Sequence, residues 1–135
     1  MTTTATSTLQ AKGLMPGITV NDLQASMKFF EGLGFAIAQR WEHEGKLVGA
    51  MINAGGINIG LSQDDWAKGR DRQKGVGVRF YISTTQNVDE LAARAKQNGV
   101  RLDKDVHDTD FGTRAFEVTE PSGFKITITS HRDEW

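Results

Sequence analysis

The side chains best suited to metal binding or acid–base chemistry are three histidines and the acidic residues near them. His107 lies with Asp108 and Asp110 in the run HDTDFG, whereas His43 lies in WEHEG and His131 opens HRDEW. None of them has the His-x-x-x-His spacing that puts two imidazoles on one helix face. The sequence therefore favours solvated histidines in turns, with a loop metal site at His107 and Asp110 as the alternative.

The sequence contains few residues or motifs typical of a catalytic nucleophile or of a phosphate-binding loop. The chain has no cysteine, which excludes disulfides, thiolate nucleophiles and cysteine-ligated metals. No Gly-x-Ser-x-Gly motif is present, and the glycine-rich runs AGGINIG and GVGVR do not precede a helical pattern. These glycines instead indicate close backbone approach in curved strands, or space left in a cavity.

Length and composition describe one ordinary globular domain. The 135 residues are 38% hydrophobic and 24% charged with a net charge of −1, so a nucleic-acid partner is not expected. No apolar run approaches the roughly 20 residues that cross a membrane, and MTTTATSTLQAK lacks the apolar centre of a signal peptide. We expect residues 1–12 to be a flexible tail on a cytoplasmic protein.

Two halves of the chain show the same order of elements. In residues 13–62 the strand-like GLMPGITV runs into a helical pattern, and three more strand-like segments follow. After the polar loop 63–75, residues 76–131 repeat that order, beginning with the strand VGVRFYIS. The repeat predicts an α+β fold of two tandem βαβββ modules, with a sandwich of accidentally similar halves as the alternative.

Matched helix ends strengthen the repeat. Asn21 and Asn87 each stand before a helical pattern as N-caps. Gly34 and Gly99 each fit the left-handed position that ends a helix.

The segment EVTEPSGFKITITS, residues 117–130, predicts the last hairpin. Pro121 fits the second position of a β-turn and Gly123 the fourth. After the turn, apolar residues alternate with Lys125, Thr127 and Thr129, which predicts one buried and one polar face.

Two of these segments resemble the vicinal oxygen chelate superfamily, which includes glyoxalase I, extradiol dioxygenases and bleomycin-resistance proteins. ITVNDLQASMKFFEGLGF is similar to the family's first strand and helix, and FEVTEPSGFKITI to its closing hairpin, with Glu120 and Ser122 in place of two aspartates. The resemblance covers residues 13–130 and implies a single domain over 13–131. In that fold the two modules form an open curved sheet around a cleft, commonly completed by a homodimer.

Metal-dependent members of this family place one ligand on each of four strands. The resemblance puts these positions at Met15, Gly60, Gly77 and Thr127, and a shift of one residue brings in apolar neighbours. None of the four supplies the imidazole or carboxylate that Zn²⁺, Ni²⁺ or Fe²⁺ needs. We therefore expect no metal and no other cofactor.

The resemblance also implies that the polar strand faces line the cleft, so that Arg79 and Tyr81 point inward. Aromatic walls with one or two cations suit an apolar or aromatic ligand that bears an anionic or polar group. Arg79 could equally pair with Glu117, and Trp41 could pack in the core or a dimer interface. The expected ligand-binding residues are Met15, Thr19, Trp41, Trp66, Gly77, Arg79, Tyr81, Lys125 and Thr127.

Three functions follow as hypotheses. The first is a metal-independent, homodimeric small-molecule binding protein of the bleomycin-resistance type. The second is a glyoxalase-like lyase or isomerase, or a dioxygenase-like enzyme. It would use relocated ligands among His107, Asp108, Asp110 and Glu117, or no metal at all. The third is a module that docks to another protein through loop 63–75.

Overall fold

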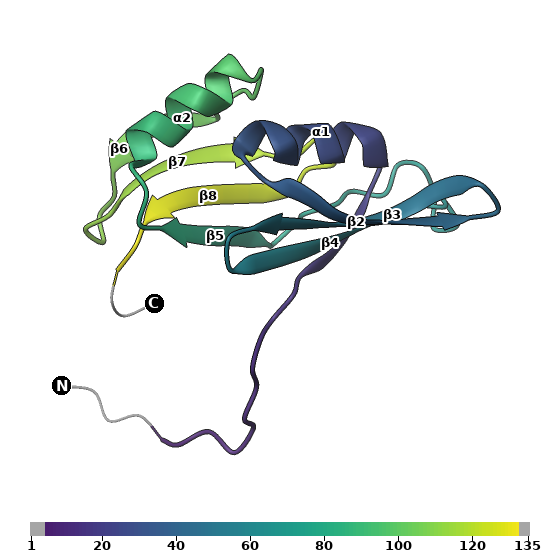
Figure 1. The fold of residues 1–135 in the computed structure, drawn as a ribbon, viewed down its shortest axis with the longest axis horizontal. Helices are drawn as coiled ribbons and strands as arrows, with labels where there is room; N and C mark the ends of the chain where they lie inside the picture. Colours follow the sequence, from purple (N-terminus) through teal and green to yellow (C-terminus); the bar gives the residue numbers. More distant parts are fainter. Residues whose placement is uncertain (1–4, 133–135) are drawn as a thin grey trace.

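The computed structural model describes residues 5–132 and contains two four-stranded sheets, each packed against one helix (Figure 1). Module one consists of β1 (Gly17–Val20), α1 (Leu23–Leu33), β2 (Ala36–His43), β3 (Lys46–Ala54) and β4 (Ile57–Gln63). Module two consists of β5 (Arg79–Thr84), α2 (Val88–Gln97), β6 (Lys104–Asp108), β7 (Arg114–Thr119) and β8 (Lys125–Ser130). The strand orders, β1-β4-β3-β2 and β5-β8-β7-β6, are the same, which confirms the α+β fold of two βαβββ modules.

The N-terminal segment extends away from both sheets (Figure 1). Residues 5–12 are exposed and lie outside any helix or strand, whereas residues 1–4 of the predicted tail lie outside the described residues. The flexibility of this tail stays a prediction.

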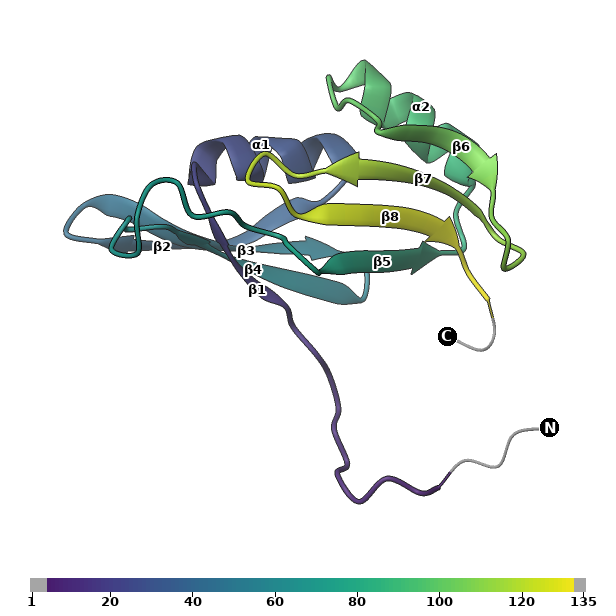
Figure 2. The ribbon, with the colours of Figure 1, turned by 180° about the vertical axis from the view of Figure 1, so that it is seen from behind.

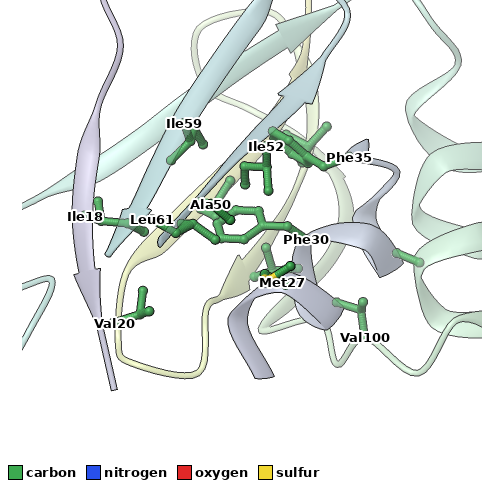
Figure 3. Packing of buried hydrophobic residues seen from close by; sticks show 14 of the residues in the cluster. Ile18, Val20, Met27, Phe30, Phe35, Ala50, Ile52, Ile59, Leu61 and Val100 are labelled. Carbon is green, nitrogen blue, oxygen red and sulfur yellow. The ribbon is translucent and has the colours of Figure 1, made fainter. Parts of the chain in front are cut away.

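One hydrophobic core serves both modules. Met27 and Phe30 of α1 pack in the same cluster as Val100, which follows α2 (Figure 3). Gly32 permits this approach, because a Cβ at that position would lie 2.7 Å from the Val100 side chain. The amide of Asn98 adds a 3.1 Å hydrogen bond to the Gly32 carbonyl. The helices therefore join the two sheets through their packing.

The N-cap of α1 differs from the prediction by one residue. Asp22 caps the helix, since its carboxylate accepts a 3.2 Å hydrogen bond from the Ala25 N–H. Asn21 is not available as a cap, because its side-chain oxygen accepts from Lys74 at 2.5 Å and its N–H donates to Ser122.

The other helix ends follow the sequence pattern. Asn87 caps α2 by accepting a 3.0 Å hydrogen bond from the Glu90 N–H. Gly34 and Gly99 adopt left-handed φ angles of +110° and +85°. Neither helix in the described part of the chain is long and apolar enough to cross a membrane.

The linker between the modules is fixed at both ends, in a region that we call the joint (Asn21, Asp64, Lys74, Gly75 and Gly123). The Lys74 ammonium lies 2.8 Å from the Asp64 carboxylate, and both side chains are almost fully buried. The Lys74 hydrogen bond lowers the pKa of Asp64 below its ordinary value. Gly75, with φ of +76°, lies so close to Gly123 that a Cβ on Gly75 would overlap the Gly123 carbonyl oxygen.

The turn between β7 and β8 also contacts α1. Its Gly123 N–H donates a 2.8 Å hydrogen bond to the Glu120 carbonyl, which confirms the predicted turn. The Glu120 side chain is 1% exposed and accepts hydrogen bonds from the Ser26 hydroxyl and the Ser122 N–H. A carboxylate of module two is thus buried against the helix of module one.

Candidate functional site

A cavity of about 320 Å³ lies on module two, whose strands run side by side in the order β5-β8-β7-β6 (Figure 2). Its walls come from β5, β6, β7 and β8 and from residues 109–111 of the loop between β6 and β7. The side chains that matter for chemistry are Arg79, Tyr81, Lys104, His107, Glu117 and Thr127.

Strand pairing brings three of these side chains into one row. Tyr81 on β5 pairs with Thr127 on β8, and Thr127 pairs with Glu117 on β7. Directly paired residues share a sheet face, and Arg79, two residues before Tyr81, lies on that face as well. Phe80 packs against the hydrophobic core on the opposite side. The predicted alternation of β5 is therefore correct at Arg79 and Tyr81.

Glu117 is held loosely between two basic groups. One carboxylate oxygen lies 3.4 Å from the Arg79 guanidinium and the other lies 3.9 Å from His107 Nε2. Both distances exceed the 2.7–2.9 Å or so of a good charge-assisted hydrogen bond. Arg79 makes its shorter contact with Thr127, donating at 3.0 Å to the hydroxyl. The Glu117 carboxylate, 27% exposed, thus remains able to bind another group.

His107 is oriented by the backbone of its own strand. Its Nδ1 lies 2.9 Å from the Asp105 carbonyl oxygen, which can only accept a hydrogen bond. Nδ1 therefore carries a proton, and Nε2 is the nitrogen that faces Glu117. The expectation of a solvated turn histidine is wrong here, because His107 belongs to β6 and its side chain is 23% exposed.

The other two histidines are not part of this cavity. His43 ends β2 with a side chain that is 77% exposed, as a hairpin tip predicts. His131 follows β8, where its N–H bonds to the Thr84 carbonyl, and it is exposed.

A backbone irregularity explains the cavity residues that the sequence did not indicate. The pairing of β6 with β7 shifts register between Lys104 and His107. In a regular strand these two residues, three apart, would point to opposite faces. The shift brings both to the cavity, and Phe111 of the following loop joins them. A bulge of this kind leaves no mark in the residue pattern.

The predicted ligand-binding residues divide among several places. Arg79, Tyr81 and Thr127 meet in the cavity described above. Gly77 and Lys125 line a neighbouring hollow of about 480 Å³, which Arg79 also borders. Gly77 precedes β5 rather than lying in it, and its φ is +75°.

The remaining four candidates lie in module one or in the linker. Thr19 borders a third hollow, of about 330 Å³, together with linker residues. Trp41 covers Gly49, where a Cβ would come 3.0 Å from its ring, and Met15 lies over Gly60 in the same way at 3.6 Å.

Trp66 contacts the cations of the linker. Its ring centre lies 4.9 Å from the Arg70 guanidinium carbon and 4.9 Å from the Lys74 ammonium, and its φ is +63°. Its N–H donates to Asp64 at 2.9 Å. These contacts place the ring at the joint.

The residues at the family's four metal positions do not fit a metal. Met15 precedes β1 and is 51% exposed, and Gly60 and Gly77 have no side-chain donor. Thr127 offers a hydroxyl that already accepts from Arg79. Among residues 5–132 no group of three or more His, Cys, Asp or Glu side chains is arranged to hold a metal ion.

The relocated ligand set does not assemble either. Asp108 bonds to Arg114 at 3.1 Å, and the guanidinium of Arg79 stands beside the Glu117 carboxylate. A cation at His107 and Glu117 would be repelled by that guanidinium.

Fold and site together define a protein of two βαβββ modules with a charged cavity on the second. A family model described as Glyoxalase/Bleomycin resistance protein/Dioxygenase superfamily matches residues 12–128, and the chain belongs to this superfamily. A search of curated protein sequences finds no significant match.

Solved structures share the fold at low sequence identity. The hypothetical protein SA1046 from S. aureus has a TM-score of 0.69 at 17% identity, covering 90% of this chain and 95% of its own. A glyoxalase/bleomycin resistance protein/dioxygenase from Alicyclobacillus acidocaldarius has 0.69 at 20%, covering 91% and 93%. TioX from Micromonospora sp. ML1 has 0.67 at 18%, covering 89% and 100%. At these identities the likeness extends to the fold alone.

Proposed function

We propose that this protein is a metal-independent binding protein of the bleomycin-resistance type, for an apolar or aromatic small molecule with an anionic group. The observation that carries the proposal is Arg79 in the module-two cavity together with Tyr81, a residue that is 60% exposed. A guanidinium binds a carboxylate through two parallel hydrogen bonds, and an aromatic ring nearby covers the apolar part of the ligand.

The contacts of Arg79 leave room for such a ligand. Its ion pair with Glu117 is long at 3.4 Å and partly exposed, so a ligand carboxylate can compete for the guanidinium. Its hydrogen bond to Thr127, which is 5% exposed, holds the arginine side chain against the sheet. The arginine is thus positioned before a ligand arrives, which reduces the entropy cost of binding.

We further propose a cytoplasmic homodimer in which module one of the second copy covers the cavity. Trp41 and Met15, 43% and 51% exposed, lie on the face of module one opposite α1, over Gly49 and Gly60. Exposed apolar groups gathered on one face are typical of protein interfaces. Sedimentation velocity across a concentration series tests this, and a monomer at every concentration would contradict it.

Calorimetric titration with phenylacetate and with benzylamine tests the binding proposal. We expect phenylacetate to bind and benzylamine, which carries the opposite charge, to bind far more weakly. Arg79→Gln should weaken phenylacetate binding about tenfold or more, because a charge-assisted hydrogen bond contributes about 1.5–3 kcal/mol. Arg101→Gln, at an exposed arginine outside the cavity, is the matched control. Failure of phenylacetate and of larger aromatic carboxylates to bind the wild-type protein would contradict the proposal.

A metal titration separates this proposal from a metalloenzyme. We expect no binding of Ni²⁺, Zn²⁺, Mn²⁺ or, without oxygen, Fe²⁺, since the family's four positions lack imidazole and carboxylate groups. Stoichiometric binding at micromolar affinity would overturn metal independence.

A further inference from the structure

We propose that the ligand of this protein carries its acidic group between two apolar parts, as an N-acyl aromatic amino acid does. This inference rests on the proposed function, because it requires an acid to bind beside Arg79. It adds a second binding surface, the hollow of about 480 Å³ that Gly77 and Val78 line, and a second cation, Lys125.

The first support is the position of Arg79 between two concave surfaces. This residue lines both the module-two cavity of about 320 Å³ and the neighbouring hollow of about 480 Å³. Gly77, two residues before it, borders the hollow, and Tyr81, two residues after it, lines the cavity. The cavity and the hollow therefore meet at Arg79, and a carboxylate bound there has space on two sides. Each space alone has the size of a small-molecule pocket.

The second support is the apolar character of the hollow. Five of its eight lining residues are glycine or valine, and Val76 and Val78 are 73% and 45% exposed. The chain turns here, since the Val78 N–H donates to the Gly75 carbonyl at 3.4 Å. A Cβ on Gly77 would meet no heavy atom within 4 Å, so the space beside it is open. Exposed apolar groups gathered around one hollow are typical of a binding surface.

The third support is a pair of cations at the boundary. Arg79 on β5 pairs directly with Lys125 on β8, and Lys125 also lines the hollow. Like charges in directly opposite positions destabilise a sheet. Within residues 5–132 the Lys125 ammonium has no ion pair, whereas Arg79 has its long contact with Glu117. A ligand carboxylate between the two cations would offset their repulsion and hold the acid at the boundary.

Together these features define the shape of the ligand. A carbon that bears a carboxylate, an arylmethyl group and an acylamino chain presents an acid with an apolar group on either side. In the proposed pose the ring lies on Tyr81, the acid between Arg79 and Lys125, and the chain over Val78. Residues two apart on a strand are separated by about 7 Å, which an arylmethyl group spans.

Two N-acyl amino acids test the second apolar part. N-hexanoyl-L-phenylalanine differs from N-acetyl-L-phenylalanine only by a longer acyl chain, with the same acid and the same ring. Calorimetric titration should show about tenfold tighter binding of the hexanoyl compound, because burial of half of the added CH2 surface gives that ratio. Equal affinities would overturn the inference.

Variants of the hollow show where the chain binds. Val78→Ser should lower the ratio of the two affinities about threefold, because it removes apolar surface from the hollow. Val48→Ser is the matched control, since Val48 of β3 is 40% exposed, and it should keep the ratio. Tyr81→Ala should weaken both ligands equally. Thermal melts show whether each variant is folded, and an unchanged ratio in folded Val78→Ser protein overturns the assignment of the hollow.

A charge variant tests the cation pair. Lys125→Gln should weaken both ligands about threefold or more and leave their ratio unchanged, because both carry the same carboxylate. Lys28→Gln, at an exposed lysine of α1, is the control and should change neither affinity. Unchanged affinities in Lys125→Gln would overturn the role of Lys125.

The remaining outcomes separate this inference from the proposed function. Binding of phenylacetate with no gain from the hexanoyl chain overturns the inference alone and leaves the proposed function standing. A Val78→Ser protein with a weaker dimer in sedimentation velocity and an unchanged affinity ratio would assign the hollow to a contact between two copies, which overturns its role in ligand binding. Failure of every acid to bind the wild-type protein overturns the proposed function and this inference with it.

Discussion

The two modules share a topology but differ greatly in the sheet faces that lie opposite their helices. In module two this face carries Arg79, Tyr81 and Glu117, and the charged groups lie within one cavity. In module one the equivalent face carries Trp41 over Gly49 and a run of small or apolar residues. Both sheets nevertheless bury the same kind of aliphatic and aromatic side chains against their helices.

This difference shows how a repeated unit separates stability from function. The helix-facing positions of both modules must stay apolar, because together they form one core. The opposite faces are free of that requirement, so each can change its chemistry independently. In our proposal, module two supplies the polar contacts to a ligand and module one of the partner supplies the apolar wall.

The joint should be the position most sensitive to a small substitution. Gly75→Ala would place a Cβ on the backbone of Gly123 and force a left-handed alanine. We expect a loss of about 2–5 kcal/mol in the free energy of unfolding, from strain and overpacking together. Chemical denaturation measures it.

Gly55→Ala in module one is the matched control, with a φ of +57° and no heavy atom within 4 Å of the added Cβ. It should cost about 1–2 kcal/mol, from the left-handed backbone alone. Equal losses in the two variants would contradict a close-packed joint.

Loss of the buried contact between α1 and the turn before β8 should cause the second-largest decrease in the free energy of unfolding. Ser26→Ala removes a hydroxyl that donates to the buried Glu120 carboxylate. The loss should be about 1–3 kcal/mol, because a buried acceptor is left without one of its donors. Ser62→Ala, at an exposed serine of β4, should change the free energy of unfolding by less than about 0.5 kcal/mol. An unchanged Ser26→Ala protein would show that water replaces the hydroxyl.

Much of the fold could be predicted because local signals agree with one another. Caps at Asn87, Gly34 and Gly99 and the turn at Gly123 follow from backbone chemistry that short segments display. The predicted cap at Asn21 is wrong, because the Asn21 side chain bonds to Lys74, 53 residues away, and Asp22 caps the helix instead.

The residues of the candidate site also divide into those that the sequence predicted and those that it did not. Alternation along regular strands correctly placed Arg79, Tyr81 and Thr127 on one face. Lys104 and His107 reach the cavity together because of a register shift in β6. The position of the Trp66 ring depends on the left-handed backbone conformation of that residue. Neither feature has a residue pattern of its own, so both required the structure.

The two proposed walls of the ligand site can be compared directly. Tyr81→Ala should weaken phenylacetate binding about five- to tenfold, through loss of aromatic contact. If module one of a second copy covers the cavity, Trp41→Ala should weaken it to a similar degree and also weaken the dimer. Calorimetry and sedimentation velocity on both variants provide the measurement. A Trp41→Ala dimer with unchanged affinity would restrict the ligand site to module two.

The smallest expected effect is on stability in acid, and it concerns surface ion pairs of module two. A two-point hydrogen bond from Arg114, at 2.8 and 2.9 Å, lowers the pKa of Asp89, and Lys96 lowers that of Asp105. A carboxylate whose pKa is lowered by folding stabilises the protein above its unfolded pKa. That contribution is lost as the pH falls from about 4 through the folded pKa.

Asp89→Asn should therefore reduce the drop in melting temperature between about pH 5 and pH 3, while its own stability at neutral pH is slightly lower. The effect should be small, because Asp89 and Arg114 are about half exposed and water screens their attraction. Glu42→Gln, on the exposed edge of module one, is the control and should follow the wild-type curve. If both variants change the drop in melting temperature between about pH 5 and pH 3 equally, general charge repulsion rather than the Arg114 pair governs stability in acid. The two modules would then not differ in the acid sensitivity of their surface charges.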